Sequence, residues 1–414
     1  MNAPTDNPNH GLATRTRFIL TLGMLTSMSA FTVDLSLPAL PAAADALGTS
    51  MSSIQSVVGL YIAGFGLGQL PAGFMADRVG RRPVLFVGLA VFIVGGIVSG
   101  LATSSGALLA SRFVQGLGGA SAAVLARTIV RDVSQGTHAA RLMSLLIMLV
   151  TAAPMLAPTL GGLLVDLSNW RSPFLASALL GLAATAMVLA FLPDTHRPAP
   201  DLPPLAQQAG RSIRNFFAER ESVFGLILLS VFSAGFMAMI AGASTVVDEV
   251  YGYSPTAFGL IFALAGASFL VGSLFSRAWV HRLGLDHMIR IGVLVMGAAG
   301  IFLLVCNALG TVAIGWFWGS VCLQMFGAAF FMPNATALAL ERLPHMAGAG
   351  ASILGTLQGV TGWAGALLGA MLYNGTISSI SIMLGVAGLA NVALYFALRK
   401  WASADQADAT VVGR

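Results

Sequence analysis

The sequence predicts an all-α polytopic membrane protein, with twelve transmembrane helices arranged in two six-helix halves. Three observations support this fold class. Only 9% of the 414 residues are charged and 57% are hydrophobic, whereas about a quarter of the residues of a soluble domain are charged. Apolar stretches of roughly 20 residues, the length that a helix needs to cross the hydrocarbon core, recur along the chain. The basic residues are unevenly distributed among the turns between these stretches.

Twelve apolar stretches define the expected membrane helices. They do not show the roughly ten-residue alternating pattern of transmembrane β-strands, so a helical bundle is expected. The stretches cover about residues 18–40, 51–74, 84–103, 106–128, 140–164, 172–192, 223–246, 256–278, 288–308, 311–333, 348–373 and 377–398.

The longest polar stretch divides the chain into two halves. It is proline-rich at first and then amphipathic, which is expected for a linker outside the membrane. The expected units are an amino-terminal tail at 1–17, an amino-terminal half at 18–192, a central linker at 193–222, a carboxy-terminal half at 223–398 and a carboxy-terminal tail at 399–414.

A faint internal repeat relates the two halves. The stretch that begins at Phe65 aligns with the stretch that begins at Phe269, at an offset of 204 residues. The matching positions are Gly68, Arg78 and Gly80 in the first half and Gly272, Arg282 and Gly284 in the second. Two parallel halves of this kind are typical of one large architecture of secondary transporters.

The basic residues predict the orientation. If the amino terminus is cytoplasmic, all but two of the 21 basic residues lie in cytoplasmic segments or beside them; Arg171 lies outside and Arg112 lies within a span. Cytoplasmic loops carry the excess of Lys and Arg. Both termini are therefore expected in the cytoplasm. Topology then explains the net charge of +5, and nucleic acid is not an expected partner.

The turn between the second and third spans carries the densest charge. The stretch GFMADRVGRRPVLF, residues 73–86, resembles the signature G-x-x-x-D-R-x-G-R-[RK] of the major facilitator superfamily. The matching residues are Gly73, Asp77, Arg78, Gly80, Arg81 and Arg82. The resemblance implies that this acid and these arginines bond across the interface of the halves, near the start of the eleventh span, and favour an outward-facing state. A simple stop-transfer cluster is the alternative.

The fourth span contains an arginine within the membrane. Arg112, Gln115 and Gly116 lie on one helix face and resemble the superfamily's R-x-x-Q-G motif. A charge at the bilayer centre costs about 2.5–3.5 kcal/mol on insertion scales, so Arg112 is expected to face a cavity or a partner. The alternative is that its side chain extends to the outer surface.

The first span contains Asp34, the one acid that the sequence places firmly inside a span. Burial favours a neutral carboxyl, and a nearby arginine favours a charged one. A carboxyl balanced between these effects can bind and release a proton. Asp34 and Arg112 are therefore the expected proton-coupling residues, and a static pair is the alternative.

The fifth span reads TAAPMLAPTLGG and places two prolines and two glycines on one stripe: Pro154, Pro158, Gly161 and Gly162. Missing backbone donors and small residues make such a helix bendable and closely packed. The stripe resembles the antiporter motif of drug exporters, with Ala157 where the family usually has glycine. With DLSLPALP in the first span and AGASILGTLQG in the eleventh, it resembles the Bcr/CflA group of multidrug:proton antiporters.

This resemblance implies proton-driven efflux of small amphiphilic drugs, amphenicol- or bicyclomycin-like, across a bacterial inner membrane by alternating access. The proton gradient would be the energy source, with no cofactor or metal, and the chain is expected to work as a monomer in membrane lipid. Uptake or exchange of a small metabolite is the alternative. An enzyme is not expected, because the sequence has no H-E-x-x-H spacing and its single lysine, Lys400, is not in a Walker motif.

The substrate cavity is expected to be mostly apolar in the carboxy-terminal half. The candidate lining residues are Gln324, Phe330, Asn334 and Gln358, each of which has packing inside the half as its alternative role.

Overall fold

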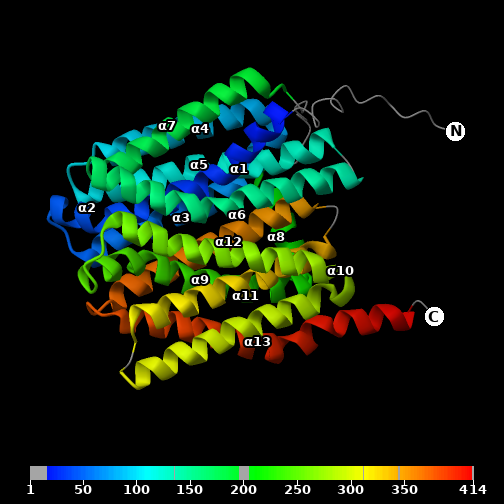
Figure 1. The fold of residues 1–414 in the computed structure, drawn as a ribbon. Coiled ribbons are helices and arrows are strands. Elements are labelled where there is room, and N and C mark those ends of the chain that lie inside the picture. The colour runs from blue at the N-terminus through cyan, green and yellow to red at the C-terminus, as the bar shows by residue number, and fades with distance from the viewer. Residues whose placement is uncertain (1–15, 135, 195–204, 311, 344–345, 413–414) are drawn as a thin grey trace.

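The computed structural model describes residues 16–134, 136–194, 205–310, 312–343 and 346–412. Within these ranges the chain is almost entirely helical and contains no strand. Figure 1 shows the long helices lying side by side in two layers, with both chain ends at the same end of the bundle.

The amino-terminal half begins with a broken helix. The chain runs from α1 through the short 3-10 turn η1, which holds Pro38, into α2, which holds Pro41. Proline has no amide hydrogen to donate, which explains the change of hydrogen bonding at this place. The first span therefore reaches Leu47, further than the expected end at residue 40. The elements of this half are α1 (Thr16–Ser36), η1 (Leu37–Ala39), α2 (Leu40–Leu47), α3 (Met51–Val79), α4 (Arg81–Gly100), α5 (Ser105–Val133), α6 (Gly136–Leu167) and α7 (Ser172–Phe191).

The carboxy-terminal half follows a short linker helix, α8. Its longest element, α10, has 54 residues and turns at Gly284, where the backbone is not helical, so it supplies two spans. The elements are α8 (Leu205–Ala218), α9 (Arg220–Glu249), α10 (Pro255–Ala308), α11 (Ile314–Glu341), α12 (Ala347–Leu372) and α13 (Ile377–Val412).

The described helices are those of a multi-pass membrane protein. Nine of them are long and apolar enough to cross a membrane, counting α1 to α2 as one and the double span α10 as one. By length, α6 with 32 residues and α12 with 26 residues complete the twelve spans. Large apolar side chains face outward, such as Leu179 at 65% exposure and Met371 at 70%, as expected for a surface in contact with lipid. The predicted fold class is confirmed.

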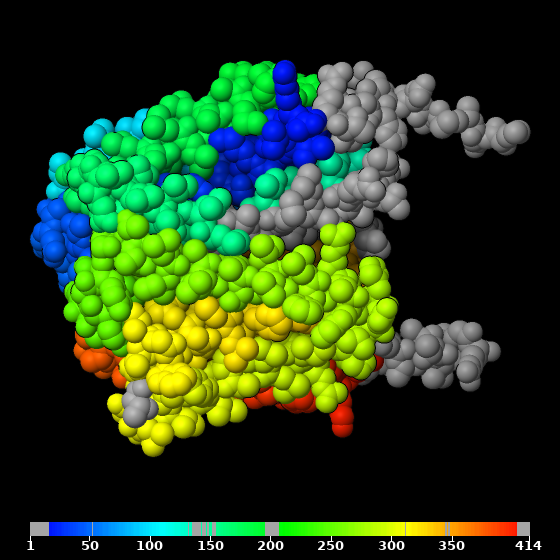
Figure 2. All heavy atoms as spheres, viewed as in Figure 1, coloured from blue at the N-terminus to red at the C-terminus, as the bar shows by residue number. Residues whose placement is uncertain are grey.

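The two halves meet mainly along two helix pairs, α3 with α12 and α6 with α10, and also where α2 and η1 meet α9 and α10. Across the first pair, the Thr356 hydroxyl donates a hydrogen bond to the Gly66 carbonyl oxygen at 2.7 Å. Figure 2 shows the amino-terminal half, coloured blue to green, stacked on the carboxy-terminal half, coloured yellow-green to red. We call the end that carries residues 77–82 the basic end, and the end that carries α2 and residues 250–254 the opposite end.

The repeat in the sequence corresponds to a repeat in backbone conformation. Gly80 joins α3 to α4 with φ 100° and ψ 160°, and Gly284 joins the two parts of α10 with φ 78° and ψ 167°. Residues with a side chain rarely adopt this region, so each of these turns requires glycine.

We expect Gly80→Ala and Gly284→Ala each to destabilise the protein by about 1–3 kcal/mol, because alanine is strained at these φ values. The measurement is the melting temperature of the purified protein in detergent. Gly106→Ala is the matched control, because Gly106 is helical with open space around it. A fall in melting temperature as large in the control as in the two variants would contradict the explanation.

Candidate functional site

Arg112 is fully buried, at 0% exposure, inside the amino-terminal half. Its Nη1 donates to Gln115 Oε1 at 2.7 Å, and its Nη2 donates to Ser36 Oγ at 3.2 Å. The guanidinium carbon lies 4.5 Å from the centre of the Tyr61 ring and 5.5 Å from that of Phe174. Neutral groups from α1, α3, α5 and α7 therefore surround this charge, and cation–π contacts with the two rings stabilise it.

The other residues of the fourth-span motif hold neighbouring helices in place. The Gln115 side chain accepts from Arg112 and donates through Nε2 to Ser177 Oγ at 2.8 Å, which connects α5 to α7. A side chain at Gly116 would meet the Tyr61 carbonyl oxygen at 2.1 Å, so only glycine allows α3 to lie this close. The motif thus builds the surroundings of Arg112.

Asp34 is also buried, at 5% exposure, but the structure does not pair it with Arg112. Ser36, two residues further along α1, occupies that position. Residues two apart on a helix do not face the same side, so a helix that turns Ser36 toward Arg112 turns Asp34 away. Among the described residues, Asp34 has no hydrogen bond or ion pair. The expectation that the two charges lie together is not met in this arrangement.

Several buried polar atoms near the motif are left without hydrogen-bond partners within the described part of the chain. They include Arg112 Nε and the hydroxyl of Thr32 on α1. Ser29 and Tyr61 both lie beside Gly119 on α5. Sequence reasoning did not identify Tyr61 or Ser36, because nothing in the spacing shows which face of a neighbouring helix meets Arg112.

The charged turn at the basic end forms a compact ion-pair network. The Arg81 side chain is 7% exposed; its Nη1 pairs with Asp77 Oδ1, and its Nε lies 3.1 Å from Asp132 Oδ2. Asp132 belongs to the end of α5 and is absent from the signature, although it follows the fourth-span motif in sequence. Arg82 instead donates to the Leu189 carbonyl oxygen of α7 at 3.4 Å. The network thus ties α3, α4 and α5 together.

This turn also faces the other half across a cavity of about 380 Å³. Gly73 and Asp77 line it from α3, and Gly348 and Ser352 line it from the start of α12. The resemblance implied bonds across this interface. In this structure Asp77 pairs with Arg81 of its own half and borders the cavity toward α12.

The glycines of the fifth span pack closely at the opposite end. A side chain at Gly161 would meet the Leu35 carbonyl oxygen at 2.1 Å, and one at Gly162 would meet the Pro255 carbonyl oxygen at 2.4 Å. The Pro158 carbonyl oxygen in turn approaches Gly259 of α10. The stripe therefore contacts α1 on one side and α10 of the carboxy-terminal half on the other side. The side chain of Pro154 lies outside the described residues.

The four candidate residues of the carboxy-terminal half do not form one group. Gln324 donates through Nε2 to the Leu384 carbonyl oxygen of α13 at 3.4 Å. Asn334 donates through Nδ2 to Ser276 Oγ of α10 at 3.1 Å. The Phe330 ring packs on Trp279, also of α10, with centres 6.3 Å apart. Gln358 lies half-buried on α12, where its carbonyl oxygen accepts from Ser233 at 2.9 Å. Their role in a substrate cavity stays a prediction.

Comparison with known proteins identifies relatives across the whole chain. The model of the Major Facilitator Superfamily matches residues 22–366 and again 226–409. A bicyclomycin resistance protein homolog of Haemophilus influenzae is 30% identical over 379 residues, which cover 90% of this chain and 92% of the relative. Multidrug resistance protein D of Escherichia coli is 29% identical over 371 residues, which cover 90% and 93%. Multidrug resistance protein MdtL of Shigella flexneri is 30% identical over 346 residues, which cover 83% and 85%.

Solved structures share the fold at lower sequence identity. A POT family transporter in complex with a thioalcohol-conjugated peptide matches with a TM-score of 0.75 and 16% identity, over 94% of this chain and 97% of the other. The xylose transporter XylE of E. coli, in a partially occluded inward open conformation, matches with a TM-score of 0.69 and 16% identity, over 91% and 97%. These likenesses show the fold alone.

We expect Asp132→Asn to destabilise the protein by about 1–3 kcal/mol, because it removes a charged partner from the buried Arg81. Asp77→Asn should cost less, since the Asp77 side chain is 38% exposed against 17% for Asp132. Melting temperatures in detergent measure both effects. Asp194→Asn, at an exposed carboxylate, is the control. Equal melting temperatures for wild type and Asp132→Asn would contradict the assignment of Asp132 to the network.

Proposed function

The chain belongs to the major facilitator superfamily, and from this premise we propose that it exports small amphiphilic drugs, amphenicol- or bicyclomycin-like, in exchange for protons. The observation that carries the proposal is about 30% identity, over nine-tenths of the chain, to relatives named for bicyclomycin and multidrug resistance. The buried carboxyl of Asp34 in the first span supports the proton-driven part.

The distribution of charge supports an orientation in the bacterial inner membrane. The basic end carries Arg78, Arg81 and Arg82, and the carboxy-terminal half adds Arg342 and Arg399 there, both paired with Glu221. The opposite end carries Asp45 of α2, Asp166 of α6, and Asp248 and Glu249 at the end of α9. Because positive residues collect on the cytoplasmic side, we place the basic end and both termini in the cytoplasm.

The arrangement around Asp34 supports a coupling step. A buried carboxylate without a cation partner is costly, so the unpaired state fits a protonated Asp34. Loss of the proton creates a charge that Arg112 can neutralise by exchanging Ser36 for Asp34, since its Nε already lacks a partner among the described residues. Proton entry from outside then restores the present arrangement. Each charge that moves inward is worth about 2.3 kcal/mol per 100 mV of membrane potential.

Close packing offers a route from this step to the movement of the halves. Asp34 precedes Leu35, whose carbonyl oxygen lies against Gly161 of α6. The next residue of α6, Gly162, lies against Pro255 of α10 in the other half. There is no free space at either contact, so a displacement of α1 has to be transmitted to α6 and α10. We propose this chain of contacts as the connection between proton release and alternating access.

We expect Asp34→Asn to abolish active efflux and substrate-induced proton release, because an amide cannot titrate, while drug binding stays measurable. Resistance of an efflux-deficient host to chloramphenicol and bicyclomycin measures efflux, and proton release is measured on the detergent-solubilised protein. Asp194→Asn is the control for loss of an acid outside the site. Resistance and proton release at wild-type levels in Asp34→Asn would place the coupling group elsewhere.

A panel of amphiphilic antibiotics that includes chloramphenicol and bicyclomycin tests the proposed function itself. Expression of the wild-type chain in the same host should raise resistance to at least one amphiphilic antibiotic, and dissipation of the proton gradient should abolish the effect. Unchanged susceptibility to the whole panel, with normal protein levels in the membrane, would favour the metabolite carrier instead.

A further inference from the structure

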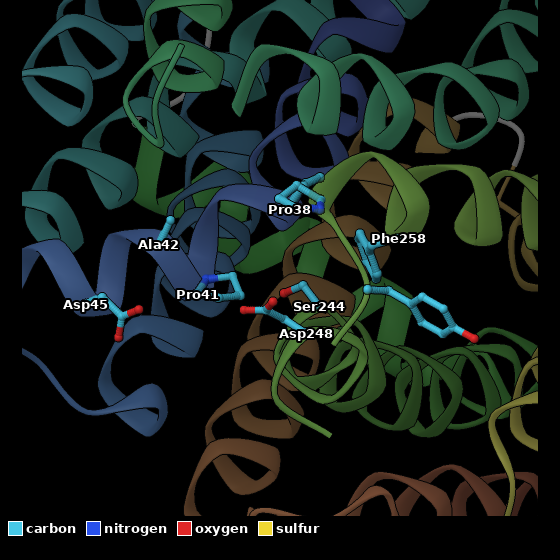
Figure 3. Close-up of a pocket in the computed structure, with 9 residues that line it drawn as sticks. Pro38, Pro41, Ala42, Asp45, Ser244, Asp248 and Phe258 are labelled. Carbon is cyan, nitrogen blue, oxygen red and sulfur yellow. The ribbon is translucent and has the colours of Figure 1, made fainter. Parts of the chain in front are cut away.

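A second interface between the halves lies at the opposite end of the bundle. It encloses a pocket of about 170 Å³, bordered by α2 and η1 from one half and by α9 and the start of α10 from the other. Figure 3 shows the residues that line it, with Asp45 and Pro41 on the α2 side and Asp248 and Ser244 on the α9 side. None of these residues belongs to the proposed coupling pair or to the charged turn.

The pocket carries two carboxylates without a positive partner. The side chains of Asp45 and Asp248 are exposed, line the same pocket and form no ion pair within the described part of the chain. Arg171, a basic residue of the turns at this end, does not line the pocket and lies over the Trp170 ring, 4.2 Å from its centre. Two like charges from separate halves thus face one space.

A buried hydroxyl at the wall of the pocket is a second observation beside the two carboxylates. Ser244 is 2% exposed and lines the pocket, yet its Oγ has no hydrogen-bond partner among the described residues. Figure 3 shows Ser244 beside Asp248. A buried polar atom is normally paired, so an O–H group or a primary ammonium group that reaches this wall of the pocket would supply the donor that the hydroxyl oxygen lacks.

The rest of the lining indicates the chemistry of that ligand. Phe258, Tyr253 and three prolines supply apolar and aromatic surface next to the carboxylates. Aromatic rings with acids recognise organic ammonium groups, whereas Ca²⁺ takes six to eight oxygen ligands. No group of three or more His, Cys, Asp or Glu side chains suited to a metal occurs in the described ranges. Drug-sized ligands occupy roughly 300–1,000 Å³, so this pocket suits only a small head group.

We propose that this pocket binds the ammonium group of a small organic cation between Asp45 of one half and Asp248 of the other. The bound cation attracts both carboxylates and removes their mutual repulsion, so it stabilises the closed contact at this end. The ammonium group comes either from a soluble compound or from an ethanolamine lipid head group. The inference does not depend on drug export, because binding is measured without transport.

The test measures choline binding to the full chain in nanodiscs of phosphatidylglycerol, by saturation-transfer NMR on the choline methyl protons. We expect saturable binding, a loss of about tenfold in affinity for Asp45→Asn and for Asp248→Asn, and no measurable binding in the double variant. The uncharged isostere 3,3-dimethylbutan-1-ol should bind far more weakly than choline.

Glu249→Gln is the matched control, because it removes a charge from the residue next to Asp248. Glu249 does not line the pocket; it accepts a hydrogen bond from the Tyr373 hydroxyl at 2.9 Å. Burial and this bond raise the pKa of Tyr373, as expected for a phenol that donates to a carboxylate. Glu249 acts on Asp248 through its charge from outside the pocket, so a loss of choline affinity clearly smaller than that of Asp45→Asn supports a local site. An equal loss in Glu249→Gln would indicate only a general acidic surface and overturn the proposal.

Further measurements distinguish a lipid head group, a soluble cation and a metal ion as the ligand. Weaker apparent choline binding in discs that contain phosphatidylethanolamine supports the lipid head group as the source, and unchanged binding supports a soluble cation. Unchanged choline binding in the double variant, or equal binding of the uncharged isostere, would overturn the proposal. Release of choline by equimolar Ca²⁺ would show a metal site and would overturn it too. Unchanged elution from a gel-filtration column verifies that each variant is folded.

Discussion

A fully buried arginine with neutral partners is the constraint around which the amino-terminal half is built. Removing a guanidinium from water costs several kcal/mol unless its surroundings compensate. Here four helices contribute to that compensation: α5 through Gln115, α1 through Ser36, and α3 and α7 through the rings of Tyr61 and Phe174. The helices can supply these groups only at close range, which explains why glycine, such as Gly116, occupies the contact with α3. The charge and the packing around it therefore require each other.

The same constraint underlies the response to protonation that we propose for Asp34. Arg112 has hydrogen bonds that can be exchanged, and its Nε has no partner among the described residues. When Asp34 loses its proton, its carboxylate becomes a stronger partner for the Arg112 guanidinium than the Ser36 hydroxyl. The change occurs one residue from Leu35, where α1 lies in direct contact with Gly161 of α6, and α6 lies in direct contact with the other half. In the proposed mechanism, these contacts connect a change of charge at Asp34 to the interface of the halves.

Much of this architecture could be predicted from the sequence, because spans follow from hydropathy and turns from charge and glycine. The repeat of Gly80 at Gly284 was visible as a weak alignment, and it corresponds to one shared backbone conformation. The partners of the charges were harder to predict. Helical spacing shows which residues share a face, but it does not show how one helix is rotated against the next. For this reason the pairing of Arg112 with Ser36 and of Arg81 with Asp132 was found only in the structure.

The central claim is that Asp34 carries a proton in the unpaired arrangement and loses it when substrate binds. Infrared difference spectroscopy of the protein in lipid measures this directly, through the carbonyl stretch of a protonated carboxylic acid. The account predicts such a band in the substrate-free wild type, its absence in Asp34→Asn, and its loss when the transported drug is added to the wild type. Identical spectra for wild type and Asp34→Asn in this region would contradict the account.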